Sequence, residues 1–411
     1  MLLPLANKNL HSRIIVEDAY QFFFLVAYGI WLGAMIASTT FLAAKIGQSI
    51  LNLIRYVALG GAILSSVFMR RRISTELLGL ALLLVISFVI VRTNAPTLVD
   101  LVILVYCGRI CPFKRIARET VYITSAGMAI IILLAEIGAI QNYTQVVATS
   151  DGSTRVREYI GFLYALQPAQ LVFNVTCLIV YLLDDKFDLR WGLLLITANI
   201  FVYAKTDSRL SFFISVAVIV CALVLSKEIG RRVLGPILRT IAPVSFVLCF
   251  IFSWYAVTHF SAGNMFQSSL NAFLGDRLKL GQNALMQYGT TIFGQNINFI
   301  GNGLDVNGTL NTSGTYNYVD ILYVRLPILY GWIFTVLFIA GMTFAAICAM
   351  RRRQYSVCLV LIAIAFHGIV DDLVIRLQFC TFLFLIGTYV CQSDMSIKEK
   401  STTQHGNKFL T

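Results

Sequence analysis

The chain has 411 residues; 58% of them are hydrophobic, 13% are charged, and the mean hydropathy is +0.79. This composition excludes a soluble globular protein, because too few polar side chains are available to cover a surface in water. The net charge of +12 does not indicate a nucleic-acid partner, since most basic residues gather in short clusters between apolar segments. We therefore expect a single transmembrane domain over residues 1–411.

Apolar segments follow one another along the chain, and about 20 such residues cross roughly 30 Å of hydrocarbon. The sequence predicts an all-α polytopic integral membrane protein with about twelve transmembrane helices. The segments at 96–108 and 190–205 are short, which leaves this number open by one pair. The expected spans are 20–40, 51–69, 75–92, 96–108, 119–139, 165–183, 190–205, 209–226, 240–259, 319–349, 356–372 and 374–392.

Basic residues are distributed unevenly between the connections. Every cluster of three or more falls on the side shared by the two chain termini, and this asymmetry places both termini in the cytoplasm. The start of the chain has no small-residue cleavage site, so the first apolar segment is expected to remain as a span. The clusters are Arg70, Arg71 and Arg72; Arg109, Lys114, Arg115 and Arg118; Lys227, Arg231, Arg232 and Arg239; Arg351, Arg352 and Arg353; and Lys398, Lys400 and Lys408.

Two sizeable segments remain on the outer side, at 140–164 and 260–318, and loops as long as the second are usually functional. Within the second, residues 274–289 carry apolar and polar side chains on opposite helical faces. We expect a short amphipathic helix in the outer interface, with Arg277 at the boundary between the faces. A plain interfacial anchor is the alternative. The apolar face holds Leu274, Leu278, Leu285 and Tyr288, and the polar face holds Asp276, Lys279, Asn283 and Gln287.

Arginines mark the outer ends of several expected spans. A charge inside a span costs about 2.5–3.5 kcal/mol, so Arg325 and Arg376 should face a cavity, a partner or a ligand. Pairing with nearby aspartates is the alternative. Because guanidinium groups bind phosphate oxygens bidentately, arginines that converge on one cavity predict a phosphate or pyrophosphate site. The outer arginines are Arg155, Arg157, Arg209, Arg277, Arg325 and Arg376.

The sequence does not predict a metal or another cofactor. Cys107 and Cys111 have no accompanying cluster of cysteine or histidine, so they are interpreted as packing residues. The outer carboxylates do not form a clustered D-x-D pattern either, which favours a site without a metal ion.

Four short motifs together resemble the Wzy-type polysaccharide polymerases, and the similarity runs over most of the chain. They are Arg157-Glu158-Tyr159-Ile160-Gly161-Phe162 followed by Pro168; Thr206-Asp207-Ser208-Arg209; Arg277 leading to Ile292-Phe293-Gly294; and Val319-Asp320 leading to Tyr330-Gly331. The chain departs from the family at Gln167-Pro168-Ala169, where His-Pro-Asn is common, and at Asp371-Asp372, where a glutamate is common.

The resemblance implies a GT-C-like glycosyltransferase in the bacterial cytoplasmic membrane that joins repeat units of an O-antigen, capsule or exopolysaccharide at the outer face. The implied donor is a growing chain on undecaprenyl pyrophosphate, and the implied acceptor is one lipid-linked repeat unit. Besides these lipid-linked glycans and the membrane lipid, the flippase and the chain-length regulator of the same pathway are implied partners.

Residue chemistry fits such a transfer. Preorganised arginines can stabilise the leaving pyrophosphate, for which Arg157, Arg209, Arg277, Arg325 and Arg376 are the candidates. The acceptor hydroxyl can lose its proton to a general base, and the sequence leaves that choice open. The candidate bases are Asp320, Asp371, Asp372, Glu158, His259 and His367, the last within an expected span where a packing histidine is as well supported.

Three other functions are compatible with parts of this pattern. An O-antigen ligase shares the expected spans, outer loop and lipid-pyrophosphate donor but transfers finished polymer. A flippase or transporter should have two related halves with broken helices, and no such symmetry is found in the sequence. A purely structural membrane protein leaves the cost of Arg325 and Arg376 unexplained.

Overall fold

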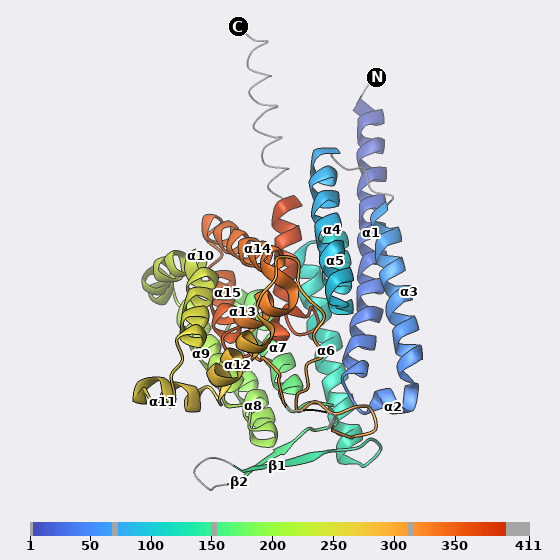
Figure 1. Cartoon of the computed structure of the whole chain (residues 1–411). Helices are drawn as coiled ribbons and strands as arrows, with labels where there is room; N and C mark the ends of the chain where they lie inside the picture. The colour runs from blue at the N-terminus through green and yellow to red at the C-terminus, as the bar shows by residue number, and fades with distance from the viewer. Residues whose placement is uncertain (1–2, 68–72, 149–153, 311–313, 315, 392–411) are drawn as a thin grey trace.

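The computed structural model describes residues 3–67, 73–148, 154–310, 314 and 316–391 (Figure 1). Six helices are long and apolar enough to cross a membrane by length and composition, and five further apolar helices are shorter. The expectation of an all-α membrane protein is confirmed at this level, whereas the number of twelve spans stays a prediction. The expected basic clusters at Arg70, Arg71 and Arg72 and at Lys398, Lys400 and Lys408 lie outside the described residues.

Most expected spans coincide with a helix, although the first helix begins at Leu3 instead of residue 20 and another begins at Glu228 instead of residue 240. The helices are α1 (Leu3–Ser38), α2 (Leu42–Ile46), α3 (Gln48–Val67), α4 (Ile73–Thr93), α5 (Pro96–Gly108), α6 (Phe113–Glu136), α7 (Leu166–Leu183), α8 (Leu189–Thr206), α9 (Arg209–Leu225), α10 (Glu228–Thr258), α11 (Met265–Phe273), α12 (Arg277–Tyr288), α13 (Leu322–Arg325), α14 (Gly331–Arg351) and α15 (Tyr355–His367). A further apolar helix, Thr381–Cys391, closes the described chain.

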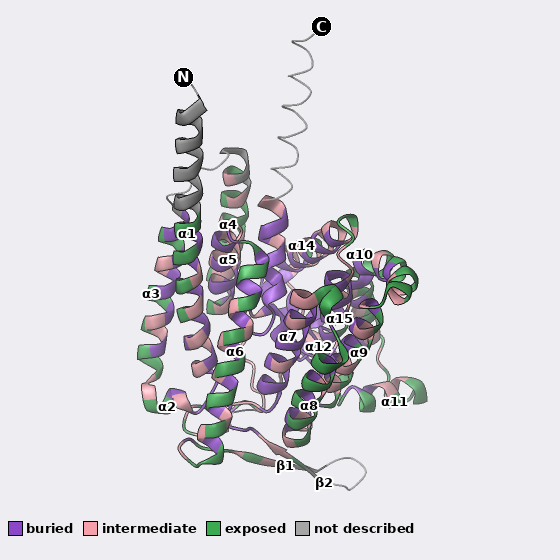
Figure 2. Ribbon diagram, turned by 180° about the vertical axis from the view of Figure 1, so that it is seen from behind, coloured by how far each residue is buried: buried purple, intermediate pink, exposed green. Residues whose placement is uncertain are grey.

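The bundle has a buried interior and an apolar outer surface. Helix α1 packs on α3 and α6, α10 packs on α14 and α15, and α9 packs on α7, α8 and α15. Outward-facing side chains such as Leu53, Val57 and Leu84 are more than 60% exposed, and exposed residues follow the outer sides of the helices in Figure 2. An exposed apolar surface on this scale is expected where helices face lipid.

The two connections expected on the outer side lie at one end of the molecule. The segment 140–164 contains a hairpin of β1 (Thr144–Ala148) and β2 (Thr154–Glu158), paired antiparallel with Val146 opposite Val156. The sequence placed this segment on the outer side without predicting an element in it, and the run Thr144–Ala148 does not alternate strictly between polar and apolar residues. Figure 1 shows the hairpin and α11 at the end opposite the start of α1.

The segment 260–318 holds two short helices instead of one. Helix α11 is capped by Asn264, whose side chain accepts the Gln267 N–H at 3.2 Å, and α12 begins at Arg277. The expected start at Leu274 is therefore wrong, because Gly275 and Asp276 take positive φ angles that end one helix before the next. The face of α12 that carries Leu278 packs on α10 and α13, so it faces the bundle.

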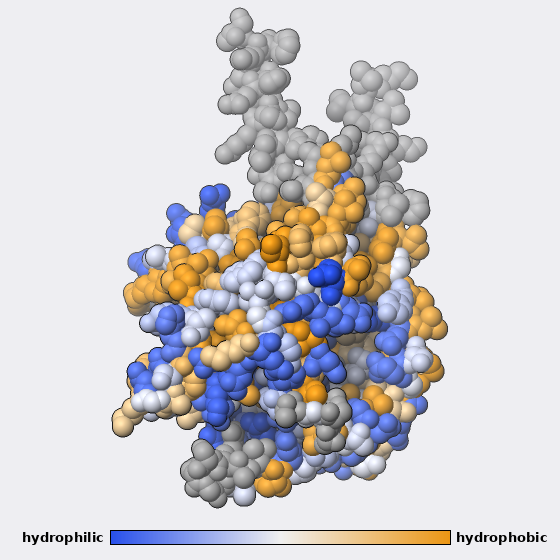
Figure 3. Space-filling view, viewed as in Figure 1, coloured by the Kyte–Doolittle hydropathy of each residue, from blue (hydrophilic) through white to orange (hydrophobic). Residues whose placement is uncertain are grey.

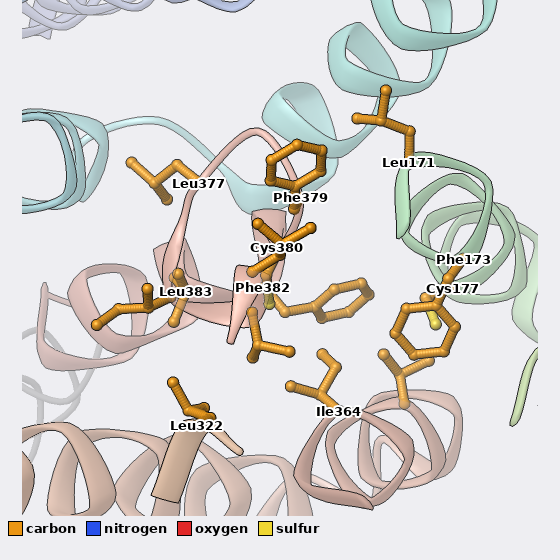
Figure 4. Packing of buried hydrophobic residues seen from close by; sticks show 14 of the residues in the cluster. Leu171, Phe173, Cys177, Leu322, Ile364, Leu377, Phe379, Cys380, Phe382 and Leu383 are labelled. Carbon is orange, nitrogen blue, oxygen red and sulfur yellow. The ribbon is translucent and has the colours of Figure 1, made fainter. Parts of the chain in front are cut away.

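The expected spans 356–372 and 374–392 extend beyond the helices at their adjoining ends. Helix α15 ends at His367 and the next helix begins at Thr381, so 368–380 form a buried connection with only a short 3₁₀ turn. Its polar groups have partners on α7: Asn174 bonds Thr381 at 3.0 Å, and Gln170 donates to the Phe379 carbonyl at 3.4 Å. Figure 4 shows Phe379 and Phe382 packed between α7 and α15.

The expected span 319–349 is broken near its start. A π turn, Leu326–Tyr330, separates α13 from α14 and includes Pro327, which has no N–H to donate. The preceding loop is fixed at this break, because the Gln295 N–H donates to Leu329 and the Trp332 N–H donates to Thr291, both at 3.0 Å. The Leu322 N–H also donates to the Gly368 carbonyl at 3.0 Å. The residues that enter α13 are thus held on two sides.

Gly331 lies at this break, at a position with no room for a side chain. Its φ is +83°, and a Cβ there would lie 2.3 Å from the Gly294 nitrogen. We expect Gly331→Ala to destabilise the protein by about 1–3 kcal/mol, because the conformation is open almost exclusively to glycine. The check is the thermal unfolding midpoint in detergent, with Gly33→Ala on α1 as the matched control, since nothing lies within 4 Å of a Cβ there. Equal midpoints for the two variants would contradict the prediction.

Candidate functional site

A cavity of about 610 Å³ lies where the outer connections meet the helix bundle. Its wall combines β2, the turn between α8 and α9, the start of α12, the loop before α13 and the connection after α15. Figure 3 shows hydrophilic residues gathered over the lower centre of this face of the molecule. The predicted site residues that line the cavity are Arg157, Arg209, Arg277, Asp320 and Asp371.

Two helices begin at the cavity, and each begins with an arginine. Helix α9 starts at Arg209 and α12 starts at Arg277. An aspartate with positive φ lies two residues before α9, Asp207 at 49°, and directly before α12, Asp276 at 64°, and turns the chain sharply at each place. The first N–H groups of a helix have no acceptor within it and carry a partial positive charge, so this wall favours an anion.

Arg277 is held by the protein and keeps donor capacity. Its Nη1 donates to the Leu274 carbonyl at 2.8 Å, and its Nε lies 3.6 Å from Asp320 Oδ2. Within the described part of the chain, Nε is buried without a hydrogen bond. Burial opposes the charge, but Asp320 and neighbouring acidic groups outweigh it, so the pKa of Arg277 is raised. The guanidinium therefore stays charged and can still bind an oxygen ligand.

Asp320 is the carboxylate that faces Arg277. It is 8% exposed, and burial raises its pKa while Arg277, Arg325 and Arg157 lower it. Arg209 stands at the cavity mouth, with an exposed side chain whose Nε donates to Asp207 Oδ1 at 3.1 Å. The positive charges thus run from a partly buried arginine, Arg277, to an exposed one, Arg209, along the same wall.

Asp371 is a buried carboxylate in the cavity wall. It is 4% exposed, and its Oδ1 accepts the Leu373 N–H at 2.9 Å. Its Oδ2 is buried and has no hydrogen-bond partner among the residues that the structure describes. Burial raises the pKa of Asp371, and the charge on Asp372 raises it further. Such a group is suited to accepting a proton from a ligand in the cavity.

Asp372 and Arg325 form a separate buried cluster behind the cavity wall. Asp372 accepts the Tyr318 hydroxyl at 3.0 Å, and its Oδ2 lies 3.4 Å from Arg325 Nη1. The Arg325 guanidinium stacks over the rings of Phe299 and Tyr318 at 4.6 and 4.3 Å. Structural pairing, the alternative raised from the sequence, therefore describes Arg325. It ties the loop before α13 to the connection after α15.

The remaining predicted residues lie elsewhere. Arg376 is in the buried connection, which corrects its expected place inside a span, and it is not part of the described cavity wall. His259 is exposed at the end of α10, with Nδ1 2.9 Å from the Thr258 hydroxyl and its ring on Tyr255. Glu158 accepts a hydrogen bond from Lys205 at 2.9 Å. The side chain of Arg155 lies outside the described residues.

His367 lies behind the cavity wall. It is fully buried, its ring stacks on Phe173, and its Nε2 is 3.0 Å from the Ser211 hydroxyl, which lines the cavity. The histidine therefore reaches the cavity through Ser211. Packing and hydrogen bonding account for its presence in the bundle.

Sequence reasoning missed several polar residues of the wall. Tyr164, Asn302 and Tyr316 line the cavity, and none of them belongs to a periodic or charged pattern. Asp207 and Ser211 flank Arg209, and their place directly before and within the start of α9 is a signal that could have identified them. Within the described ranges, no three His, Cys, Asp or Glu residues are arranged to hold a metal ion.

Comparisons with known proteins do not identify a family. No protein-family model, no curated protein and no solved structure matches this chain. The resemblance to Wzy-type polymerases therefore rests on the motifs of the sequence, and the site has to be interpreted from its own chemistry.

Proposed function

We propose that the protein is a membrane glycosyltransferase that polymerises undecaprenyl-pyrophosphate-linked repeat units into a surface polysaccharide. The observation that carries the proposal is the meeting of Arg157, Arg209 and Arg277 with Asp371 in one cavity of a membrane protein. In this proposal the chain crosses the bacterial cytoplasmic membrane about twelve times in a GT-C-like arrangement, and the cavity opens at the outer face.

The arginine wall fits a pyrophosphate leaving group. As the bond between the anomeric carbon and the pyrophosphate oxygen breaks, the leaving oxygen takes the electron pair and gains negative charge. Arg277 is partly buried and held by Leu274 and Asp320 before any ligand binds, so its charge stabilises the developing anion without reorganisation. Helices α9 and α12 both begin at the cavity wall, so the positive ends of their dipoles lie on the same side.

Asp371 is our choice of general base. The acceptor's sugar hydroxyl gives its proton to Asp371 Oδ2, and the hydroxyl oxygen forms the new bond to the anomeric carbon. Asp320 is already engaged with Arg277, and Asp372 with Tyr318 and Arg325, so neither is as available. Asp371 alone among these three combines a place in the wall with a buried oxygen that has no partner in the described structure.

Deletion of the gene in its native host, followed by analysis of lipid-linked glycans, tests the proposal. We expect single repeat units to accumulate on the lipid carrier, and a plasmid copy should restore a ladder with one repeat added per step. Accumulation of finished polymer on the carrier would instead indicate an O-antigen ligase. Accumulation of single units that stay inaccessible from the outer face would indicate a flippase.

A further inference from the structure

The cavity has an apolar edge beside its arginines. Ala272 and Phe273 of α11 line it, and the Phe273 side chain is 69% exposed. On the same helix Met265 and Phe266 are 86% and 75% exposed. Figure 1 shows α11 projecting from the side of the bundle at the end that carries the hairpin. A short helix with an exposed apolar face in this position is suited to lying in a membrane interface.

A second apolar surface begins at Arg209 and follows α9. Phe213, Val220 and Val224 are 59%, 48% and 43% exposed, and they follow Arg209 at helical spacing on one side of the helix. The opposite side, which carries Ser215 and Ile219, packs on α7, α8, α10 and α15. At 1.5 Å per residue the exposed stripe extends about 22 Å from the cavity into the span.

An exposed stripe alone does not distinguish α9, because every lipid-facing helix has one. What distinguishes α9 is that its first residue, Arg209, is part of the cavity wall. Phe213 follows one turn further along the helix, and Phe273 of α11 lines the same cavity. Basic groups that continue directly into an apolar surface fit a ligand with an anionic head and an apolar tail.

We propose that the polyprenyl tail of the pyrophosphate ligand leaves the cavity between α9 and α11 and lies along Phe213, Val220 and Val224. The head stays at Arg209 and Arg277, inside the cavity. This inference rests on the proposed function for the identity of the lipid. Its own content is the path of the tail, which sets the direction from which the ligand arrives: sideways from the membrane, past Phe273.

Photocrosslinking tests this path. The photoreactive residue p-benzoylphenylalanine is placed at Phe213 or Phe273 of the full chain, and at Leu53 on α3 as the matched control. Leu53 is 63% exposed, and α3 is outside the described cavity wall. Each protein is reconstituted into phosphatidylethanolamine–phosphatidylglycerol vesicles with radiolabelled undecaprenyl pyrophosphate. Only monodisperse preparations are compared.

We expect saturable labelling at positions 213 and 273, several-fold above position 53. Unlabelled undecaprenyl pyrophosphate should compete, whereas undecaprenol, which has the tail without the anionic head, should not. Labelling at 213 and 273 no higher than at 53, or equal competition by undecaprenol, would show that these side chains contact bulk lipid and overturn the path.

The same preparations separate this inference from the proposed function. If the unsubstituted protein extends lipid-linked glycans but positions 213 and 273 label no better than 53, the tail path is wrong and the polymerase proposal stands. If both positions label specifically but the protein transfers no sugar, the amphiphile site stands and the polymerase proposal fails.

Discussion

Replacing Arg277 by alanine should stop chain extension while the protein still accumulates in the membrane. The side chain is a fixed, charged donor on the cavity wall, and removing one such donor typically lowers kcat by about 10²–10³. The measurement is the ladder of lipid-linked glycans in cells, followed by single-turnover rates for the purified enzyme. Arg277→Lys should recover little activity, because an ammonium group lacks the planar pair of N–H donors with which a guanidinium binds two oxygens at once.

Two further variants make this result interpretable. Arg277→Ala leaves Asp320 buried without its partner, so Arg277→Ala is also combined with Asp320→Asn. If the double variant folds normally and still does not extend chains, lost folding cannot explain the defect. Arg232→Ala is the matched control, since this arginine on α10 is exposed and pairs with Glu228. Full-length polymer from Arg277→Ala would remove Arg277 from the site.

Asp371→Asn should have the second large effect. The substitution keeps the shape of the side chain but removes its ability to take a proton, and loss of a general base costs about 10²–10⁴ in rate. We expect kcat to fall while the KM for the lipid-linked donor changes little, because the proposal assigns binding of the donor's pyrophosphate to the arginines and not to Asp371. Asp305→Asn, at an exposed aspartate of the outer loop, should leave both constants unchanged.

The pH dependence of the rate tests the same assignment. The base works when it is ionised, so activity should rise as pH increases through its pKa. Since burial and Asp372 raise the pKa of Asp371, the rising limb should lie well above pH of about 4, the ordinary carboxyl value. Asp371→Asn should abolish this limb, and a limb that persists unchanged in that variant would assign the base to another residue.

Much of the fold follows from apolar segment length alone. The expected segment near each of α3, α6 and α7 matches a helix within a few residues, because a run of apolar residues has few alternatives in lipid. The errors occur where an apolar run is not helical. Residues 368–380 fall within the expected apolar segments, yet they form a connection whose Phe379 carbonyl accepts a hydrogen bond from Gln170, while Asn174 bonds Thr381 directly after it; both partners are far away in sequence.

The sequence could predict a cavity lined by arginines and carboxylates, but not which of the candidate residues line it. Charges at outer helix ends identified Arg157, Arg209, Arg277, Asp320 and Asp371 as candidates, and the fold brings these together. A charge near the end of a span also identified Arg325, whose burial in a membrane costs as much free energy. In the structure, however, Arg325 pairs with Asp372 and stacks on two aromatic rings. That distinction depends on three-dimensional contacts that local sequence does not encode.

The residues of the cavity wall belong to two kinds of segment, which differ in how firmly they are held. Asp320 and Asp371 belong to segments that are hydrogen-bonded into the bundle. The same hydrogen bonds that stabilise the fold therefore fix the position of Asp371, the proposed proton acceptor. The rim near Phe273 and Asn302 belongs to peripheral connections. Under the proposed function, substitutions at this rim should change which glycans are accepted, whereas substitutions in the hydrogen-bonded segments should change the chemical step.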